Sequence, residues 1–302
     1  MVMLYLSENI SGLEAVLSEE TWTELMQNHE ESLSGVLDPY LKKRSMQMKN
    51  PVLDFLFEYY AFRPSQLKRW SPGLGVILEN KNDSTLPEIS ELKIAEDHAF
   101  LYPKLFPEKK LSSLKWIHSL LEKTSKNKPF FGCFGMHEWA MVYKADDVRH
   151  DQIPLRLSHD EIAEFVESRP LLCTHFDAYR FFTKPARPLN KHKLSRETFD
   201  EMEQPGCLHT NMDLYKWAFK LYPWISSEVL REAFFNAVET RKVDMQASPY
   251  DPTEFGLEPI KIETEPGRKE YLERQTEIFE RSIPIRKKVI EEYQKVIEVV
   301  GN

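Results

Sequence analysis

Cysteine and long apolar runs are both scarce in this chain. Its 302 residues contain three cysteines, an odd number with no CxxC pair, which argues against a disulfide framework and favours a reducing compartment. No stretch approaches the roughly 20 consecutive apolar residues that span a bilayer. Residues 1–6 are apolar only briefly and lack a basic lead or a small-residue cleavage site, so we expect no signal peptide. The sequence therefore predicts a cytoplasmic protein with no membrane partner.

Glycine and basic residues are also few. Ten glycines against 41% hydrophobic and 12% aromatic residues favour packed helices over a turn-rich all-β fold. The 40 Lys and Arg residues are outnumbered by 48 Asp and Glu residues, which gives a net charge of −8. A protein that follows a phosphate backbone usually carries a basic footprint. The charge balance therefore favours a small-molecule substrate over nucleic acid.

Hydrophobic periodicity predicts a mainly α fold with a few short strands. Apolar residues recur at helical spacing over residues 18–47, 111–123, 211–221 and 225–245. Ser158 and Glu161 form a capping-box pattern, and Pro284 is expected to separate two helices, 268–282 and 285–299. Because there is no internal repeat or shift in composition, we expect one mostly helical domain over residues 1–302, with residues 128–221 as its site-bearing central stretch. The sequence predicts no particular oligomeric state.

Three clusters in the central stretch share the same residue types. Residues 132–139, 173–177 and 206–213 each contain a cysteine, a histidine two to four residues later and a carboxylate close behind. The clusters hold all three cysteines of the chain. Histidines placed at random would seldom lie so near every cysteine, so we interpret the clusters as parts of one site.

In the first cluster, His137 and Glu138 are adjacent. We expect residues 130–143 to be extended chain, in which neighbouring side chains point to opposite faces, so that only one of the two enters a given site. The alternative is structural, with His137 buried and bonded to backbone and Glu138 paired with an arginine.

The second and third clusters supply further histidine and acid pairs. On extended chain, His175 and Asp177 share a face. Together with a distant histidine such as His209 they have the composition of a facial triad for non-haem iron. His209 and Asp213 are four residues apart and share a face if the predicted helix 211–221 begins early. The alternative role of Asp213 is a favourable interaction with the helix dipole.

These pairs predict a metal-dependent enzyme. The predicted ligands are His137, His175, Asp177 and His209, and the predicted catalytic residues are Glu138, Asp177 and Asp213. Nitrogen and oxygen ligands suit iron, which we favour, and also manganese or zinc. The cysteines, flanked by apolar residues, are interpreted as small packing residues. Redox chemistry on a small or aromatic substrate is favoured over hydrolysis.

Aromatic side chains and an arginine surround the clusters. Trp139, Tyr143, Tyr179 and Trp217 are predicted to wall a pocket for a flat or apolar substrate, and Arg180 to neutralise a substrate anion. The alternative for the aromatic residues is the hydrophobic core, and for Arg180 an ion pair with a glutamate.

Several strings resemble one bacterial family. Residues 50–57 with Arg63-Pro64, and residues 131–143, 174–182 and 204–217, are similar to proteins of comparable length labelled 3-methyladenine DNA glycosylase. The resemblance covers most of the chain. It implies an alternative enzyme that flips an alkylated purine out of DNA and stacks it on Trp139, Tyr179 or Trp217. In that enzyme Asp177 or Asp213 assists water at the anomeric carbon, no metal is needed, and nucleic acid is the partner. A third alternative is a non-enzymatic helical interaction protein, in which all three clusters are structural.

Overall fold

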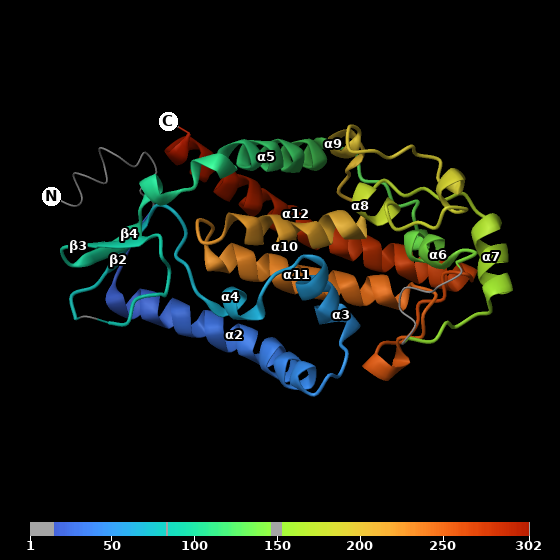
Figure 1. Cartoon of the computed structure of the whole chain (residues 1–302), viewed down its shortest axis with the longest axis horizontal. Coiled ribbons are helices and arrows are strands. Elements are labelled where there is room, and N and C mark those ends of the chain that lie inside the picture. The colour runs from blue at the N-terminus through green and yellow to red at the C-terminus, as the bar shows by residue number, and fades with distance from the viewer. Residues whose placement is uncertain (1–14, 83, 146–152, 302) are drawn as a thin grey trace. The chain divides into compact units, whose positions relative to one another are not determined.

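Helices dominate the chain, accompanied by one small four-stranded sheet (Figure 1). This computed structural model describes residues 15–82, 84–145 and 153–301, and it confirms the prediction of a mainly α fold with a few short strands. Among the described residues, no helix combines the length and the apolarity needed to cross a bilayer. Residues 1–6, for which we predicted no signal peptide, lie outside the described residues.

Contacts between Cα atoms divide the chain into two compact units. The first unit comprises the chain up to Leu121, Leu214–Phe235 and Pro284–Asn302, and the second comprises Glu122–Asp213 and Asn236–Ile283. The helices that contribute to both units are α5 (Leu111–Lys126), α10 (Leu208–Leu221), α11 (Ser227–Gln246) and α12 (Glu265–Val300). A single domain over the whole chain stays a prediction.

The first unit contains the sheet, in the strand order β1-β2-β4-β3. Its strands are β1 (Ala15–Leu17), β2 (Val76–Glu79), β3 (Leu92–Ala95) and β4 (His98–Leu101). Strand β1 is parallel to β2, and the other pairs are antiparallel. Leu78 and Ala99 are paired across β2 and β4 and pack with Trp22 and Trp70 in one apolar cluster. The indole N–H of Trp22 donates to the Glu79 carbonyl at 2.7 Å, so this buried ring keeps its polar atom satisfied.

Local capping signals explain the helices of the first unit. They are α2 (Glu19–Ser45), α3 (Pro51–Asp54), a π-helix (Phe55–Tyr59), α4 (Pro64–Lys68) and 3-10 turns at Pro103–Leu105 and Glu108–Lys110. The Ser18 side chain accepts a hydrogen bond from the Thr21 N–H and caps α2. The Asn50 side chain accepts from the Leu53 N–H and caps α3, which begins at a proline. Both are residue types that favour a helix start.

The second unit is built from short helices and loops around parts of α10, α11 and α12. Its short helices are α6 (Met136–Val142), α7 (His159–Glu167), α8 (Phe176–Tyr179) and α9 (Phe199–Met202), with 3-10 turns at Arg187–Leu189 and Thr253–Phe255. The capping box at α7 is confirmed, because Ser158 and Glu161 each bond the other's backbone N–H. Helix α6 packs against α7 through the rings of Trp139 and Phe165, whose centroids are 4.7 Å apart.

Two local predictions are wrong. Residues 130–143 are not extended throughout, because a left-handed turn at Phe134 (φ 47°) and Gly135 (φ 73°) leads directly into α6. Nor does Pro284 separate two helices, since α12 runs through it. A proline inside a helix removes one backbone hydrogen bond and costs about 3 kcal/mol. Burial of one face of α12 on both sides of the proline, at Ile278, Ile285 and Val289, offsets that cost.

Candidate functional site

Helix α6 places the first cluster in the interior of the second unit. Gly135 precedes the helix in a left-handed conformation that favours glycine. A Cβ atom at this position would lie 3.2 Å from the Cβ of Ala247 and 3.3 Å from the ring of Tyr271. The turn therefore needs glycine for both its dihedral angle and its close packing. It directs His137 and Glu138, both buried, into the first turn of α6.

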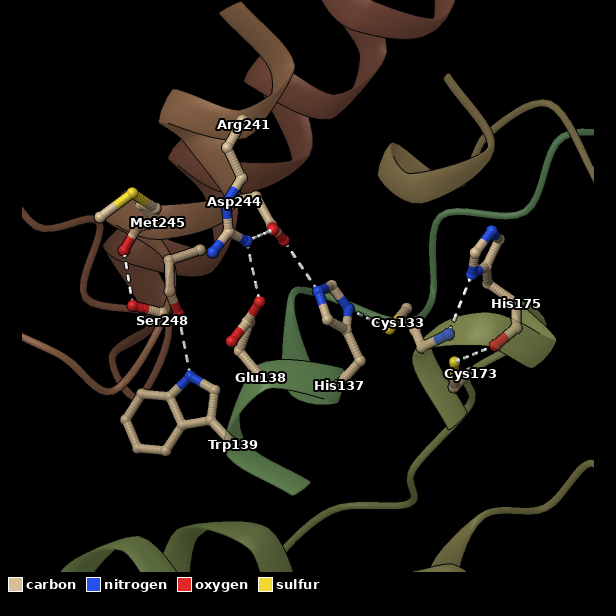
Figure 2. Close-up of polar contacts among 12 residues, drawn as sticks. Cys133, His137, Glu138, Trp139, Cys173, His175, Arg241, Asp244, Met245 and Ser248 are labelled. Atoms are coloured by element: carbon tan, nitrogen blue, oxygen red, sulfur yellow. Dashed lines mark hydrogen bonds and ion pairs between the residues drawn. The ribbon is translucent and has the colours of Figure 1, made fainter. Parts of the chain in front are cut away.

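A buried ionic network joins these two residues to helix α11. The guanidinium of Arg241 donates to Glu138 Oε1 at 3.0 Å and also to Asp244 Oδ2. Asp244 Oδ1 lies 2.8 Å from Nε2 of His137. Figure 2 shows Arg241 directed at both carboxylates and His137 directed at Asp244. All four side chains are almost fully buried, so their charges interact in a medium that screens them weakly.

His209, at the start of α10, links this network to the second cluster. Its ring centroid is 4.5 Å from that of His137 and 5.1 Å from that of His175. The ring of His209 therefore neighbours the rings of both other histidines. This arrangement confirms that the chain brings the three histidines of the clusters together.

His175 is held in one orientation by its own helix and by two acids. Its Nδ1 accepts the N–H of Ala178 at 3.1 Å, so the side chain caps α8. Its Nε2 lies 3.4 Å from Asp213 Oδ2 and 3.4 Å from Glu203 Oε1. Because Nδ1 is an acceptor, the proton of the neutral ring is on Nε2, facing the two carboxylates.

Burial and neighbouring charges shift the pKa values of His137, His209 and Asp244 in different directions. Burial by itself lowers the pKa of His137, but the charge and hydrogen bond of Asp244 outweigh it and raise that pKa well above its ordinary value. For His209, burial and the positive charge of His137 lower the pKa well below its ordinary value. Burial opposes ionisation of Asp244, yet Arg241 and the histidines hold its pKa well below the usual range. The cluster thus contains an anionic Asp244 and a neutral His209.

Four of these residues could hold a metal ion. His137, Glu138, His209 and Asp244 each offer one ligand atom, and all of these atoms lie within 4.8 Å of one another. We call this group the ligand cluster. Two of its members, His137 and His209, were predicted as ligands, and Glu138 was predicted as a catalytic residue.

The other two predicted ligands lie outside the ligand cluster. His175 faces Asp213 and Glu203. Asp177 lies in α8 and forms an ion pair with Arg180 at 2.8 Å. The expectation that His175 and Asp177 share a face is wrong, because the chain becomes helical at Phe176. His175 is the extended N-cap residue and Asp177 lies inside the helix, so the alternation of an extended chain does not hold between them.

The thiols have more specific surroundings than packing alone requires. Cys133 Sγ lies 3.5 Å from Nδ1 of His137, and Cys173 Sγ contacts the His175 carbonyl at 3.5 Å. Interaction with Cys173 and with His137 lowers the pKa of Cys133, whereas interaction with Cys133 and burial raise the pKa of Cys173. Burial raises the pKa of Cys207.

The predicted substrate-binding residues occupy different environments. Trp139 is fully buried and donates its indole N–H to the Ala247 carbonyl at 2.9 Å. Tyr143 is buried and its hydroxyl donates to Glu167. Tyr179 is half-buried, and Arg180 is exposed beside Asp177.

Trp217 belongs to the first unit, where Lys216 Nζ lies 4.2 Å from its ring centroid. The second unit thus contains every member of the ligand cluster and all predicted substrate-binding residues except Trp217.

Sequence reasoning missed Asp244, Arg241 and Glu203. Asp244 is 107 positions from its partner His137 and has no cysteine or histidine beside it. A signal was nevertheless present in the helix predicted over residues 225–245. Asn236, Thr240 and Asp244 are polar residues spaced by four, and all are buried. Buried polar residues in one row of a helix indicate partners on a neighbouring element.

The chain was compared with protein-family models, with curated proteins and with solved structures, and none of these comparisons finds a match. The resemblance to the glycosylase-labelled family therefore stays a prediction. The proposed function therefore rests on the geometry of the ligand cluster.

Proposed function

We propose that the protein is a metal-dependent enzyme whose ion is bound by His137, Glu138, His209 and Asp244. One observation carries the proposal: four potential ligand atoms from α6, α10 and α11 lie within 4.8 Å of one another in a buried environment. Iron is the favoured ion, with manganese or zinc as alternatives. The favoured reaction is redox chemistry on a small or aromatic substrate, ahead of hydrolysis.

The donor set and its spacing fit such an ion. Two imidazoles and two carboxylates are ligands that iron, manganese and zinc all accept. With metal–ligand bonds of about 2.0–2.2 Å, ligand atoms in an octahedral site are about 3 Å apart when adjacent and about 4.3 Å apart when opposite. The 2.8 Å between His137 Nε2 and Asp244 Oδ1 matches two adjacent ligands. Small side-chain movements would bring the remaining atoms to bonding distance.

Arg241 supports this assignment as a residue that orients the ligands. It holds one oxygen each of Glu138 and Asp244, which leaves the second oxygen of each carboxylate for an ion. Outer partners of this kind commonly fix metal ligands in proteins. Two carboxylates, one guanidinium and a protonated His137 sum to a net charge of zero. Loss of the His137 proton leaves a charge of −1, so a divalent cation would bind in exchange for that proton.

His175 supplies a proton-transfer group beside the ligand cluster. Its Nε2 proton faces Asp213 and Glu203, and its ring is next to that of His209. A bound ion would supply Lewis acidity or electron transfer. His175 with Asp213 would hold and deliver a proton to a substrate group near His209.

Metal binding is tested with the full-length protein. Purified wild-type protein is treated with a chelator and titrated separately with Fe²⁺, Mn²⁺, Zn²⁺ and the spectroscopic probe Co²⁺. We expect about one equivalent to bind, because the four potential ligands form one group. His209→Ala is expected to weaken binding by about 10-fold or more. The matched control is His159→Ala, which removes an exposed histidine at the start of α7.

Two outcomes would contradict the proposal. One is wild-type protein that stays folded and binds none of the four ions. The other is a His209→Ala variant that binds as tightly as the His159→Ala control. If His209→Ala does not fold, His209→Gln, which keeps a polar side chain of similar length, replaces it in the same titration.

The alternative is the metal-free glycosylase implied by the sequence resemblance. The observation that favours it is the buried pair of Asp213 and His175, which could activate a water molecule. Against it, Trp139 is fully buried and its indole N–H is already bonded to Ala247, so this ring is poorly placed to stack on a flipped base. Release of 3-methyladenine from alkylated DNA by chelator-treated protein, lost in Asp213→Asn, would support this alternative over the metalloenzyme.

A further inference from the structure

We propose that Gln204 is a positioning residue, which ties together the three segments that carry the cluster histidines and so sets the geometry of their rings. Gln204 acts through main-chain and hydroxyl groups of those segments. The inference deepens the proposed function, and its consequences for metal affinity rest on that function. Its consequences for the histidine rings do not require a bound ion.

The side-chain amide of Gln204 makes four hydrogen bonds to three separate segments. Its Oε1 accepts the N–H groups of Phe130 and Gly206, both at 2.8 Å. Its Nε2 donates to the Phe130 carbonyl at 3.1 Å and to Thr174 Oγ1 at 3.3 Å. A glutamine amide has two acceptor sites and two donor protons, so its bonding capacity is fully used. The opposite orientation of the amide would bring N–H groups against N–H groups.

Each of these contacts lies just before one of the histidines. Phe130 leads into the first cluster through the turn before α6. Thr174 directly precedes His175, the N-cap residue of α8. Gly206 lies three positions before His209 and just before the start of α10. All three segments belong to the second unit. The amide therefore fixes the spacing of the main-chain segments from which the three histidines project.

The segments at Phe130 and Gly206 also touch directly. A Cβ atom on Gly206 would lie 2.8 Å from the carbonyl oxygen and 2.9 Å from the nitrogen of Phe130, which is too close for a real side chain. Gln204 itself is buried, with 7% of its surface exposed, so its hydrogen bonds are shielded from competition by water. The junction is closely packed and hydrogen-bonded, as the support of a preorganised site must be.

Gln204→Met tests the role of the amide. Methionine has a similar length and flexibility but no amide, so the variant loses all four hydrogen bonds while still filling the space. The full-length protein is treated with a chelator and titrated with Co²⁺, whose visible absorption reports the geometry of its ligands. We expect Gln204→Met to bind Co²⁺ about 10-fold more weakly, as for other residues that orient metal ligands, and with a changed absorption spectrum.

The matched control is Gln275→Met. Gln275 is also a buried glutamine of the second unit, and its Nε2 donates to the Gly206 carbonyl at 2.7 Å. This hydrogen bond reaches one of the three segments and does not join it to the other two. We therefore expect Gln275→Met to lower the stability of the protein but to keep the Co²⁺ affinity and spectrum of the wild type.

A second pair of variants tests the contact with the second cluster alone. Thr174→Val removes the hydroxyl that accepts from Gln204, whereas Thr174→Ser keeps it. Nitrogen NMR spectra of the imidazole rings, recorded on chelated protein at one fixed pH, report each histidine without an ion. We expect Thr174→Val to shift the His175 signals, Thr174→Ser to restore them, and Gln204→Met to shift the signals of all three cluster histidines. A purely structural residue would lower the thermal midpoint without moving these signals in the folded protein.

The proposal is wrong if folded Gln204→Met keeps the wild-type histidine spectra, or if it keeps the Co²⁺ affinity and spectrum of a wild type that binds the ion. It is also wrong if Gln275→Met shifts the histidine signals as much as Gln204→Met does. If Gln204→Met does not fold, the Thr174 pair decides, and unchanged His175 signals in Thr174→Val overturn the proposal. Wild-type protein that binds no metal would refute the proposed function, and the histidine spectra would then decide on Gln204 by themselves.

Discussion

Asp244→Asn is the substitution that most directly tests the buried ionic network. Asn has nearly the same shape as Asp, so the change removes a negative charge without creating a cavity. Asp244 is the partner of both Arg241 and His137. The substitution therefore leaves Arg241 with Glu138 as its carboxylate partner within the network and deprives His137 of the charge that stabilises its protonated form.

The size of the effect follows from burial. The side chain of Asp244 is 0% exposed and that of Arg241 is 4% exposed. Breaking a buried ion pair by removing one partner costs roughly 3–5 kcal/mol, because the remaining charge stays out of water. Glu138 still pairs with Arg241, so we expect a loss near the lower limit, about 3 kcal/mol in the free energy of unfolding.

The same helix supplies a matched control. Glu239 and Lys242 of α11 also form an ion pair at a spacing of three residues, but their side chains are 52% and 39% exposed. Exposed pairs contribute about 0–1 kcal/mol, so Glu239→Gln should lower stability by less than about 1 kcal/mol. Urea unfolding of both variants in the presence of a chelator excludes stabilisation by a bound ion.

Equal stability losses for Asp244→Asn and Glu239→Gln would refute the reasoning. That result would mean that the charge of Asp244 does not stabilise the folded chain, even though it is buried between two partners. A loss well above about 5 kcal/mol would also contradict it, since it would exceed what one broken buried pair costs. Repeating the unfolding with Co²⁺ then separates stability due to metal binding from stability due to the network.

Two further predictions concern pH and the turn before α6. Burial lowers the pKa of His29 from 6.5 to about 4. As the pH falls, this histidine therefore takes up its proton at a higher pH in the unfolded chain than in the folded chain. The contribution of His29 to the free energy of unfolding should fall by about 3 kcal/mol between pH 6.5 and about pH 4. His29→Gln, which can still donate to the Leu67 carbonyl, should reduce this slope in urea unfolding at several pH values. Gly135→Ala, at φ 73°, should lower the thermal midpoint with a loss of about 1–2 kcal/mol, whereas Gly35→Ala, with open space around it inside α2, should raise stability by about 1 kcal/mol.

Local signals were sufficient where an element is long or carries a distinct cap. The helix expected over residues 18–47 is α2, and the Ser158–Glu161 pattern is a capping box. They were insufficient at residues 130–143, where α6 has only seven residues. So short an apolar segment does not distinguish helical from strand periodicity. Gly135 is the left-handed residue immediately before this helix.

In the candidate site, too, the sequence indicated residues that are close along the chain but not contacts between distant segments. Proximity in sequence indicated His137, Glu138 and His209, which the structure places in the ligand cluster with Asp244. It also indicated His175 and Asp177 as ligands, although the helical turn that begins at Phe176 directs Asp177 toward Arg180. No spacing rule connects positions 137 and 244. Their contact depends on how α6 packs on α11, which is set by tertiary structure.

His137 explains why cysteine was an informative signal. Its Nε2 faces Asp244 in the ligand cluster, while its Nδ1 faces the Cys133 sulfur. A histidine that binds an ion through Nε2 carries its proton on Nδ1 and donates it to an outer partner. Here that partner is the Cys133 sulfur. The cysteine, histidine and acid of the first cluster therefore belong to one chain of contacts, which runs from Cys133 through His137, Asp244 and Arg241 to Glu138.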